Sequence, residues 1–473
     1  MKKAILLCFL AGVSTLVADE ASFTVDAIHQ RWPWEAKIDI DFTITGEIGK
    51  KYDASPSFFN GGTKLVVPAE ALSGDIYSLE PGQHRLTLDP SKAAFGNEVL
   101  TRFSVVFGEV AETPLYMIVD LTKAKGEEGL VTYLTESDLA SGAYGSVATN
   151  PVSGVSSIVW TGVTNDAAYA TTKMVFRRVN PGTFTMGYGG ARLDGNVKIF
   201  PGAANDNGNE VQLTQPYYIA VFPTTQDQWT QLGLSNGSKF SCDSARRPVE
   251  NIGTSVGTGW ELLRGSDAAD GGYYWPSDGY AKSKNSYLGK LEDRLGLVCD
   301  LPTEAQWEYA CRAGTTTVYN DGVARTFRSD DDFTAARDDV HPLGRFYSNG
   351  GNVPNNKESL YGPTNGTANV GSYRPNAWGL YDMHGNVYEA CLDRAYSATT
   401  NHYDHCAVNP AGPRSGSATS HIGKGGAIVS GITHATSGFR WGWSRGKQYG
   451  FRVVVFPEGV VPEVGEVYSV DAE

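Results

Sequence analysis

Glycine and proline interrupt this chain so often that long helices and long strands are not expected. The 473 residues include 55 glycines and 22 prolines, and neither residue type recurs with a fixed period. Glycine weakens the interior of helices and strands, while proline ends them. The sequence therefore predicts short elements, many turns and a large share of irregular backbone.

The charge balance of the chain excludes one class of partner. Lysine and arginine total 39 against 52 aspartates and glutamates, which gives a formal net charge of -13. Nucleic-acid binding relies on clustered positive charge that neutralises phosphates, so no nucleic-acid partner is expected. No segment is apolar over the ~20 residues that a membrane-spanning helix needs, so no membrane span is expected either.

The first 18 residues carry the pattern of an export signal. Lys2 and Lys3 precede an apolar run over residues 4–13, and small residues follow up to Ala18. This order is typical of a signal peptide that is removed on secretion. The sequence therefore predicts an exported protein whose mature chain is periplasmic, on the cell surface or extracellular. The alternative is that the apolar run forms a buried N-terminal helix.

Residues 19–136 carry the pattern of an all-β domain. Four apolar residues alternate with polar ones over 38–44, which is typical of a strand with one buried face. Further short apolar runs, the last at 115–121, are separated by turn residues. Strands at this spacing predict a β-sandwich of immunoglobulin-like type. Residues 137–170 are mostly small and polar, so we expect an interdomain linker there.

Two short helices are predicted in the second half of the chain. Thr225 is followed by Gln228, and Thr303 by Gln306, which is the capping-box pattern of a helix N-terminus. Long segments rich in glycine and asparagine surround both helices, and such loops need ties such as ions or buried rings. The last residues, 456–473, are expected to form an acidic tail.

Several motifs of the second half follow one another in a fixed order and spacing. They lie at residues 180–187 (NPGTFTMG), 211–229, 247–251 (RPVEN), 301–314 (LPTEAQWEYACRAG) and 376–389 (NAWGLYDMHGNVYE), before 424–426 (KGG) and 450–452 (GFR). Each motif alone is a weak signal, but the set resembles the formylglycine-generating enzyme (sulfatase-modifying factor) family over residues 171–455. The resemblance implies a C-type-lectin-like α+β fold that is irregular and loop-rich, here preceded by the all-β sandwich.

The family's copper chemistry depends on two cysteines at fixed positions. In the family's enzyme, a cysteine pair binds Cu(I) and activates oxygen to oxidise a substrate cysteine, and soft thiolate ligands select Cu(I). The family places these cysteines four and nine residues after Gly426, where this chain has Ser430 and Ala435. No cysteine follows Cys406, so neither copper nor the family's oxidase chemistry is expected.

The resemblance also implies a calcium ion in the turn at 382–389. Carried over to this chain, the ligands are the side chains of Asp382 and Glu389 and the carbonyls of Gly385 and Val387. Two carboxylates and backbone oxygens in a tight turn suit a hard cation. Asn349 matches one ligand of a second family site. The alternative is a capped turn that holds no ion.

The resemblance places the final segment at the exposed ligand surface of the lectin-like fold. The expected ligand contacts are Ser430, His434, Arg440, Trp441, Trp443 and Arg445. Tryptophan and arginine dominate the binding energy of many interfaces. The expected ligand is a protein, a peptide or a glycan. The alternative is that the segment is core packing of two short strands.

Three functions compete on these grounds. The missing cysteine pair favours an exported, non-catalytic ligand-binding module. The near-complete family pattern favours an enzyme instead, either a divergent sulfatase-maturation oxidase or another metal-dependent oxidase. If the protein is a metal-dependent oxidase, residues 402–406 (HYDHC) offer imidazole, carboxylate and thiol groups as metal ligands. The alternative is that these residues form a polar surface loop in which Cys406 is part of a disulfide. The third function is that of a structural surface protein.

Overall fold

A computed structural model describes most of the chain between residues 21 and 465. The exceptions within this range are 32–34, 69–70, 96–98, 109, 151–156, 188–207, 241–243, 253–258, 267–272, 274, 326–337, 351–364, 396–406, 413–419, 443–447, 458–459, 461 and 463. The expected signal peptide, the 402–406 motif, Trp443, Arg445 and most of the expected acidic tail therefore lie outside the described residues.

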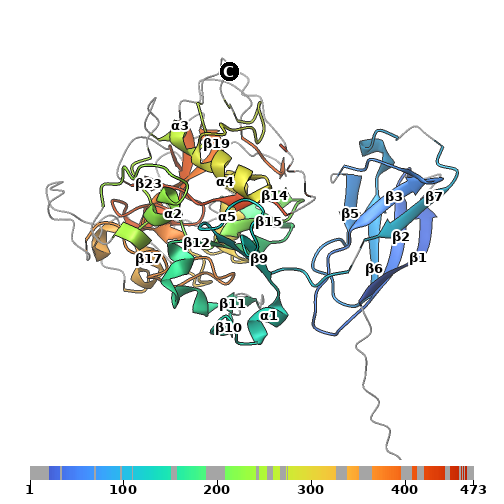
Figure 1. The fold of residues 1–473 in the computed structure, drawn as a ribbon, viewed down its shortest axis with the longest axis horizontal. Helices are drawn as coiled ribbons and strands as arrows, with labels where there is room; N and C mark the ends of the chain where they lie inside the picture. Colours follow the sequence, from blue (N-terminus) through green and yellow to red (C-terminus); the bar gives the residue numbers. More distant parts are fainter. Residues whose placement is uncertain are drawn as a thin grey trace, which may run out of the picture. The chain divides into compact units, whose positions relative to one another are not determined.

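The described chain divides into two compact units, Met1–Thr113 and Pro114–Glu473. The first unit contains two antiparallel sheets (Figure 1). The four-stranded sheet has the order β1 (Ser22–Gln30), β2 (Ile38–Thr45), β6 (Gly82–Leu88) and β5 (Leu72–Gly74). The three-stranded sheet has the order β4 (Thr63–Lys64), β3 (Pro56–Asn60) and β7 (Phe103–Phe107). The 3-10 helix η2 (Pro90–Lys92) follows β6.

One hydrophobic cluster fills the first unit. Phe42 and Leu86 of the larger sheet share it with Phe58 and Val105 of the smaller sheet. The strand expected at 38–44 is confirmed as β2, because its alternating apolar side chains lie in this cluster.

The second unit is built around a six-stranded sheet. Its strands follow the order β16 (Cys299–Asp300), β24 (Val454–Val455), β15 (Tyr217–Ala220), β12 (Lys173–Val179), β8 (Tyr116–Asp120) and β9 (Val131–Leu134). Successive side chains of a strand point to opposite faces. Met117 and Val119 accordingly lie in one hydrophobic cluster with Leu288, whereas Tyr116 and Ile118 lie in another with Trp307. The sheet is therefore buried on both faces.

Smaller elements surround this sheet (Figure 1). A four-stranded sheet has the order β22 (Trp441–Gly442), β21 (Ser420–Lys424), β19 (Tyr388–Ala395) and β23 (Tyr449–Gly450). A three-stranded sheet has the order β13 (Gly182–Met186), β14 (Asn209–Leu213) and β20 (Ala407–Val408). Two further pairs of strands are β10 (Val147–Thr149) with β11 (Ile158–Trp160), and β17 (Gly344–Arg345) with β18 (His384–Gly385). The helices are α1 (Glu136–Ala140), α2 (Gln226–Thr230), α3 (Trp260–Leu263), α4 (Tyr287–Leu295) and α5 (Glu304–Arg312). The 3-10 helices are η3 (Thr161–Thr164), η4 (Ala167–Ala170), η5 (Ser244–Arg246), η6 (His341–Leu343), η7 (Tyr347–Asn349) and η10 (Ile432–Ala435).

The expectation of short elements in a mixed α+β, loop-rich fold is confirmed. The two capping boxes are also confirmed, since Thr225 begins α2 with Gln228 and Thr303 begins α5 with Gln306. Among the described residues, no helix has the length and apolar character needed to cross a membrane.

The expected boundary between the two halves needs correction. The run at 115–121 was expected to end the first domain, but it forms β8, which pairs with β12 in the second unit. Residues 137–170 were expected to be a linker, but Trp160 is fully buried there against the rings of Tyr116 and Tyr169. The small polar residues around Trp160 suggested a linker, whereas its burial makes this segment part of the second unit.

Candidate functional site

The final segment begins at a glycine turn directly after β21. Gly425 and Gly426 both have positive φ angles, of 85° and 74°. A Cβ atom on Gly426 would lie 2.7 Å from Cβ of Ala435, which is closer than real side chains approach. Glycine at 426 therefore lets the chain fold back, so that Ser430 and Ala435 follow in one compact loop.

Ser430 is buried and its hydroxyl serves the fold. Its Oγ accepts a hydrogen bond from the Ala427 amide at 3.0 Å and donates one to the Tyr388 hydroxyl, also at 3.0 Å. Burial raises the pKa of Tyr388, so the phenol stays protonated. Ser430, expected among the ligand contacts, is only 3% exposed and lies below the surface.

Ala435 is fully buried as well. Its methyl group packs in a cluster with Tyr319, Phe346 and Ile432. Its carbonyl accepts a hydrogen bond from Nδ1 of His384 at 2.7 Å, while Nε2 of His384 accepts one from the Asn320 amide. Burial lowers the pKa of His384 to about 4, so this imidazole is neutral and both of its nitrogens are occupied.

The described cysteines do not supply the missing thiolates. Cys299, Cys311 and Cys391 are buried and none is in a disulfide. Burial raises the pKa of each thiol, to about 12 for Cys311, so all three stay protonated. Cys311 lies against the Ser437 hydroxyl, at 3.7 Å. Within the described residues, the groups at the family's copper position therefore do not fit Cu(I), which needs a pair of thiolates.

Glu389, an expected calcium ligand, is paired with an arginine. Its Oε1 accepts a hydrogen bond from Nη2 of Arg452 at 2.6 Å, and its Oε2 accepts one from Nε of Arg452 at 2.5 Å. Trp307 Nε1 also donates to Oε2, at 2.6 Å. Both charged side chains are buried. The guanidinium of Arg452 therefore occupies both carboxylate oxygens of Glu389, which a calcium ion would need as ligands.

The remaining expected calcium ligands do not compensate for this pairing. Asp382 accepts hydrogen bonds from the Gly371 amide at 2.7 Å and from Asn386 at 3.3 Å. The carboxamide of Asn349 accepts from the Phe346 amide and donates to the Gly344 carbonyl. Gly385 and Val387 are buried in the same turn. In the part of the chain that the structure describes, no three His, Cys, Asp or Glu residues gather as a metal site, and the 382–389 turn does not fit calcium.

Arg440 was expected to contact ligand, but it is held in a buried charge network. Its Nε and Nη2 each lie 2.9 Å from a carboxylate oxygen of Glu304, the first residue of α5. Lys424 bridges Glu304 at 3.5 Å and Glu308 at 2.9 Å. Burial opposes the charged form of Glu308, but Lys424 and Arg312 outweigh it and hold the pKa of this carboxyl below its usual value. Arg440 thus ties the final segment to α5.

Part of the final segment forms an aromatic patch of His434, Phe439 and Trp441. Trp441 is 45% exposed and lies parallel to Phe439, with ring centroids 6.1 Å apart. His434 meets both rings edge-on, at 4.8 Å from Phe439 and 6.2 Å from Trp441. The structure thus brings together two of the expected ligand residues. Phe439, which the sequence did not single out, forms the buried base of the patch.

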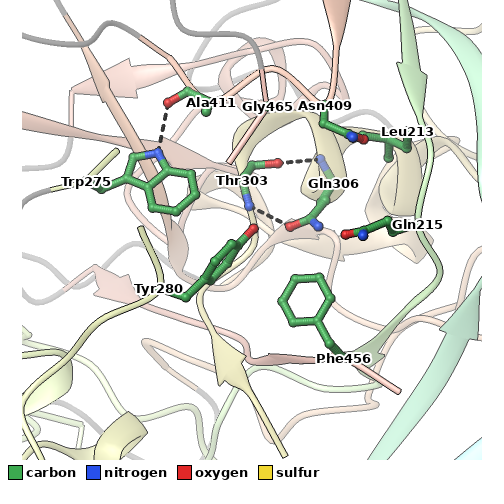
Figure 2. A pocket seen from close by; sticks show the side chains of 10 residues that line it. All are labelled: Leu213, Gln215, Trp275, Tyr280, Thr303, Gln306, Asn409, Ala411, Phe456 and Gly465. Atoms are coloured by element: carbon green, nitrogen blue, oxygen red, sulfur yellow. Dashed lines mark hydrogen bonds between the residues drawn. The ribbon is translucent and has the colours of Figure 1, made fainter. Parts of the chain in front are cut away.

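A separate, shallow pocket lies beside the start of α5 (Figure 2). Trp275, Tyr280 and Phe456 supply its aromatic lining. The polar groups serve the fold: Trp275 Nε1 donates to the Ala411 carbonyl, Gln306 accepts from the Thr303 amide, and Asn409 bonds to Thr214 with both ends of its carboxamide. This pocket therefore offers little for a polar ligand.

Comparisons with known proteins converge on one family. Residues 161–456 match the model of the sulfatase-modifying factor enzyme 1-like domain. The formylglycine-generating enzyme of Streptomyces coelicolor is 36% identical over 131 residues, which cover 27% of this chain and 36% of that protein. The enzyme of the same name from Mus musculus is 35% identical over 131 residues, or 27% and 30% of the two chains. The match thus spans about a third of the length of these relatives.

Two solved structures are more distant. Treponema denticola variable protein 1 has a TM-score of 0.40 and 19% identity, with 66% of this chain and 99% of that chain covered. CarF has a TM-score of 0.30 and 19% identity, with coverage of 59% and 97%. Neither similarity is high enough to support an argument about function.

Proposed function

This chain belongs to the sulfatase-modifying factor enzyme 1-like family, and on that premise we propose that it is a ligand-binding member without the family's oxidase chemistry. The observation that carries the proposal is the pair Ser430 and Ala435. A hydroxyl already bonded to Tyr388 and a buried methyl group supply no thiolate. The loop that would hold Cu(I) in the family's enzyme is thus part of the protein core here.

The ligand surface is the aromatic patch of His434, Phe439 and Trp441. Exposed tryptophan on a buried ring offers a rigid apolar face, and such residues act as binding hot spots. The charge network around Glu304 fixes the patch in place through Arg440. The ligand is a protein, a peptide or a glycan that stacks on Trp441.

Export and the finer fold description belong to the same proposal. The Lys2–Lys3 pattern at the N-terminus supports a signal peptide at 1–18, and with it a periplasmic, cell-surface or extracellular place for the mature chain. The hydrophobic cluster shared by the two sheets of the first unit supports a β-sandwich of immunoglobulin-like type. The family match supports a C-type-lectin-like arrangement of the second unit.

A second candidate, a divergent sulfatase-maturation oxidase, is favoured by the sequence match. The relatives that are 34–36% identical over 112–134 residues all carry the name formylglycine-generating enzyme. The chemistry of the residues at 430 and 435 weighs against it, so the binding function is preferred.

Peptide and glycan arrays probed with the purified chain separate the two functions. We expect binding that is lost in Trp441→Ala and kept in Tyr133→Ala, a control at another exposed aromatic residue of the same unit. Binding that survives Trp441→Ala would place the ligand elsewhere. A chain that binds neither array yet converts cysteine peptides would favour the oxidase.

A further inference from the structure

A second pocket lies where η3 and η4 meet the loop at residues 369–372. Its empty volume, which includes space open to solvent, is about 440 Å³. The side chains that matter to the argument are Asp166, Phe222, Arg246 and Asn369. This pocket shares no residue with the aromatic patch of the proposed function.

The pocket contains polar groups that the fold leaves unused. Oδ1 of Asn369 is buried and has no hydrogen-bond partner within the described residues. Buried acceptors are rarely left unpaired, so this atom points to a partner from outside the chain. Arg246 lines the same pocket, is exposed, and forms no ion pair within the described residues. Within the part of the chain that is described, Asp166 accepts a side-chain hydrogen bond only at Oδ1, from the Ala168 amide at 2.9 Å.

The pocket is held open by its own backbone. The Val370 amide donates to the Arg246 carbonyl at 2.9 Å, and the Gly371 amide donates to Asp382 at 2.7 Å. Gly371 has a φ of 75°, and a Cβ atom there would lie 2.9 Å from the ring of Phe222. Glycine at this position therefore lets the loop pass close to the Phe222 ring.

We propose that this pocket binds a free α-amino acid with an apolar side chain. Arg246 pairs with the carboxylate of the ligand. The ammonium group of the ligand donates hydrogen bonds to Oδ2 of Asp166 and to Oδ1 of Asn369. The buried ring of Phe222, which packs on Tyr381 at 5.3 Å, receives the apolar side chain. A pocket lined by one cation and one carboxylate suits a zwitterion, whereas Asp166 would repel a phosphate and Arg246 would repel a metal ion.

Calorimetric titration of the full chain tests the proposal with L-leucine as the probe. N-acetyl-L-leucine, which lacks the ammonium, and L-leucinamide, which lacks the carboxylate, are the matched ligands. We expect L-leucine to bind and each analogue to bind at least about tenfold more weakly, because each loses one charged contact. Arg246→Gln should weaken the binding of L-leucine by about tenfold. The same change should leave the affinity for L-leucinamide unchanged, because L-leucinamide has no carboxylate for Arg246 to pair with.

Two further variants complete the test. Arg374→Gln, at an exposed arginine of the same unit outside the pocket, should bind L-leucine as the unmodified chain does. Ala167→Phe puts a ring into the pocket from an exposed position and should abolish binding without changing the circular dichroism spectrum. The proposal is overturned by the absence of L-leucine binding, by equal affinity for the three ligands, or by binding that Arg246→Gln leaves intact.

Discussion

Arg452, just before β24, and Glu389 of β19 form a buried two-point ion pair. The two N–O distances are 2.5 and 2.6 Å, and both side chains are inaccessible to solvent. Arg452 also donates to the carbonyls of Ala220 and Tyr381. One guanidinium therefore links the six-stranded sheet to the turn at 382–389.

Removing one partner of this pair should destabilise the protein strongly. Glu389→Gln leaves the Arg452 charge buried without its counterion, and such a change costs about 3–5 kcal/mol. Urea unfolding of the second unit measures the loss. Glu128→Gln, at an exposed glutamate of the same unit, is the control and should stay within about 0.5 kcal/mol of the unmodified chain. A loss of less than about 1 kcal/mol for Glu389→Gln would contradict the role given to the pair.

Calcium should have no effect on stability. A ligand that binds only the native state raises the melting temperature by mass action, but Arg452 already neutralises the carboxylate that calcium would need. We therefore expect equal melting temperatures with excess calcium and with excess chelator. A melting temperature that falls on chelation would show that a cation binds after all, and Glu389→Gln would then tell whether it binds at this turn.

Asp393 should make the protein less stable as the pH rises towards neutrality. Burial is the main cause that raises the pKa of Asp393 to about 7, and repulsion from the Glu304 carboxylate adds to it. The folded state therefore holds this proton more tightly than the unfolded state does, so the stabilisation is complete below about pH 4 and is lost as the pH rises through 7.

The variant Asp393→Asn keeps an acceptor for the Glu304 amide but carries no charge. Its stability relative to the unmodified chain should rise between pH 5 and pH 8 by roughly 2–3 kcal/mol, because about two pKa units of the shift lie between pH 5 and pH 7. Denaturant unfolding at both pH values measures this. Asp293→Asn, at an exposed carboxylate, should show no such rise. An equal effect of Asp393→Asn at both pH values would rule out the titration.

The second unit should fold alone only when it includes β8 and β9. β8 pairs with β12 from Lys173 opposite Asp120 to Arg177 opposite Tyr116, and its side chains enter both hydrophobic clusters. A chain of residues 114–473 should therefore unfold cooperatively, whereas a chain of 171–473 should not. Near-ultraviolet circular dichroism during a urea titration distinguishes them. Cooperative unfolding of the shorter chain would mean that β8 is dispensable.

Local features were predictable from the sequence, because they depend on neighbouring residues. The capping boxes at Thr225 and Thr303 and the alternation in β2 are of this kind. Features that depend on distant partners were not predictable. Arg440 stood out as a ligand contact, but its partner Glu304 lies 136 residues earlier in the chain.

The same reason explains the error in the domain boundary, and it explains why the sequence did not reveal the arginine partner of Glu389 in the expected calcium turn. The partner of Glu389 is 63 residues away, and no local pattern marks it. The run that forms β8 resembles the strands before it, and only its pairing with β12 assigns it to the second unit. The replacement of the two cysteines by Ser430 and Ala435, by contrast, was visible in the sequence, and the structure adds that both positions are buried.

The central claim is that the loop holding Ser430 and Ala435 performs no copper chemistry. Its most direct test is mass spectrometry of a cysteine-containing sulfatase peptide after incubation with the Cu(I)-treated chain and oxygen. The account predicts no formylglycine, and it predicts Cu(I) binding only in the double variant Ser430→Cys with Ala435→Cys, because two thiolates are required. Formylglycine formed by the unmodified chain would contradict the account.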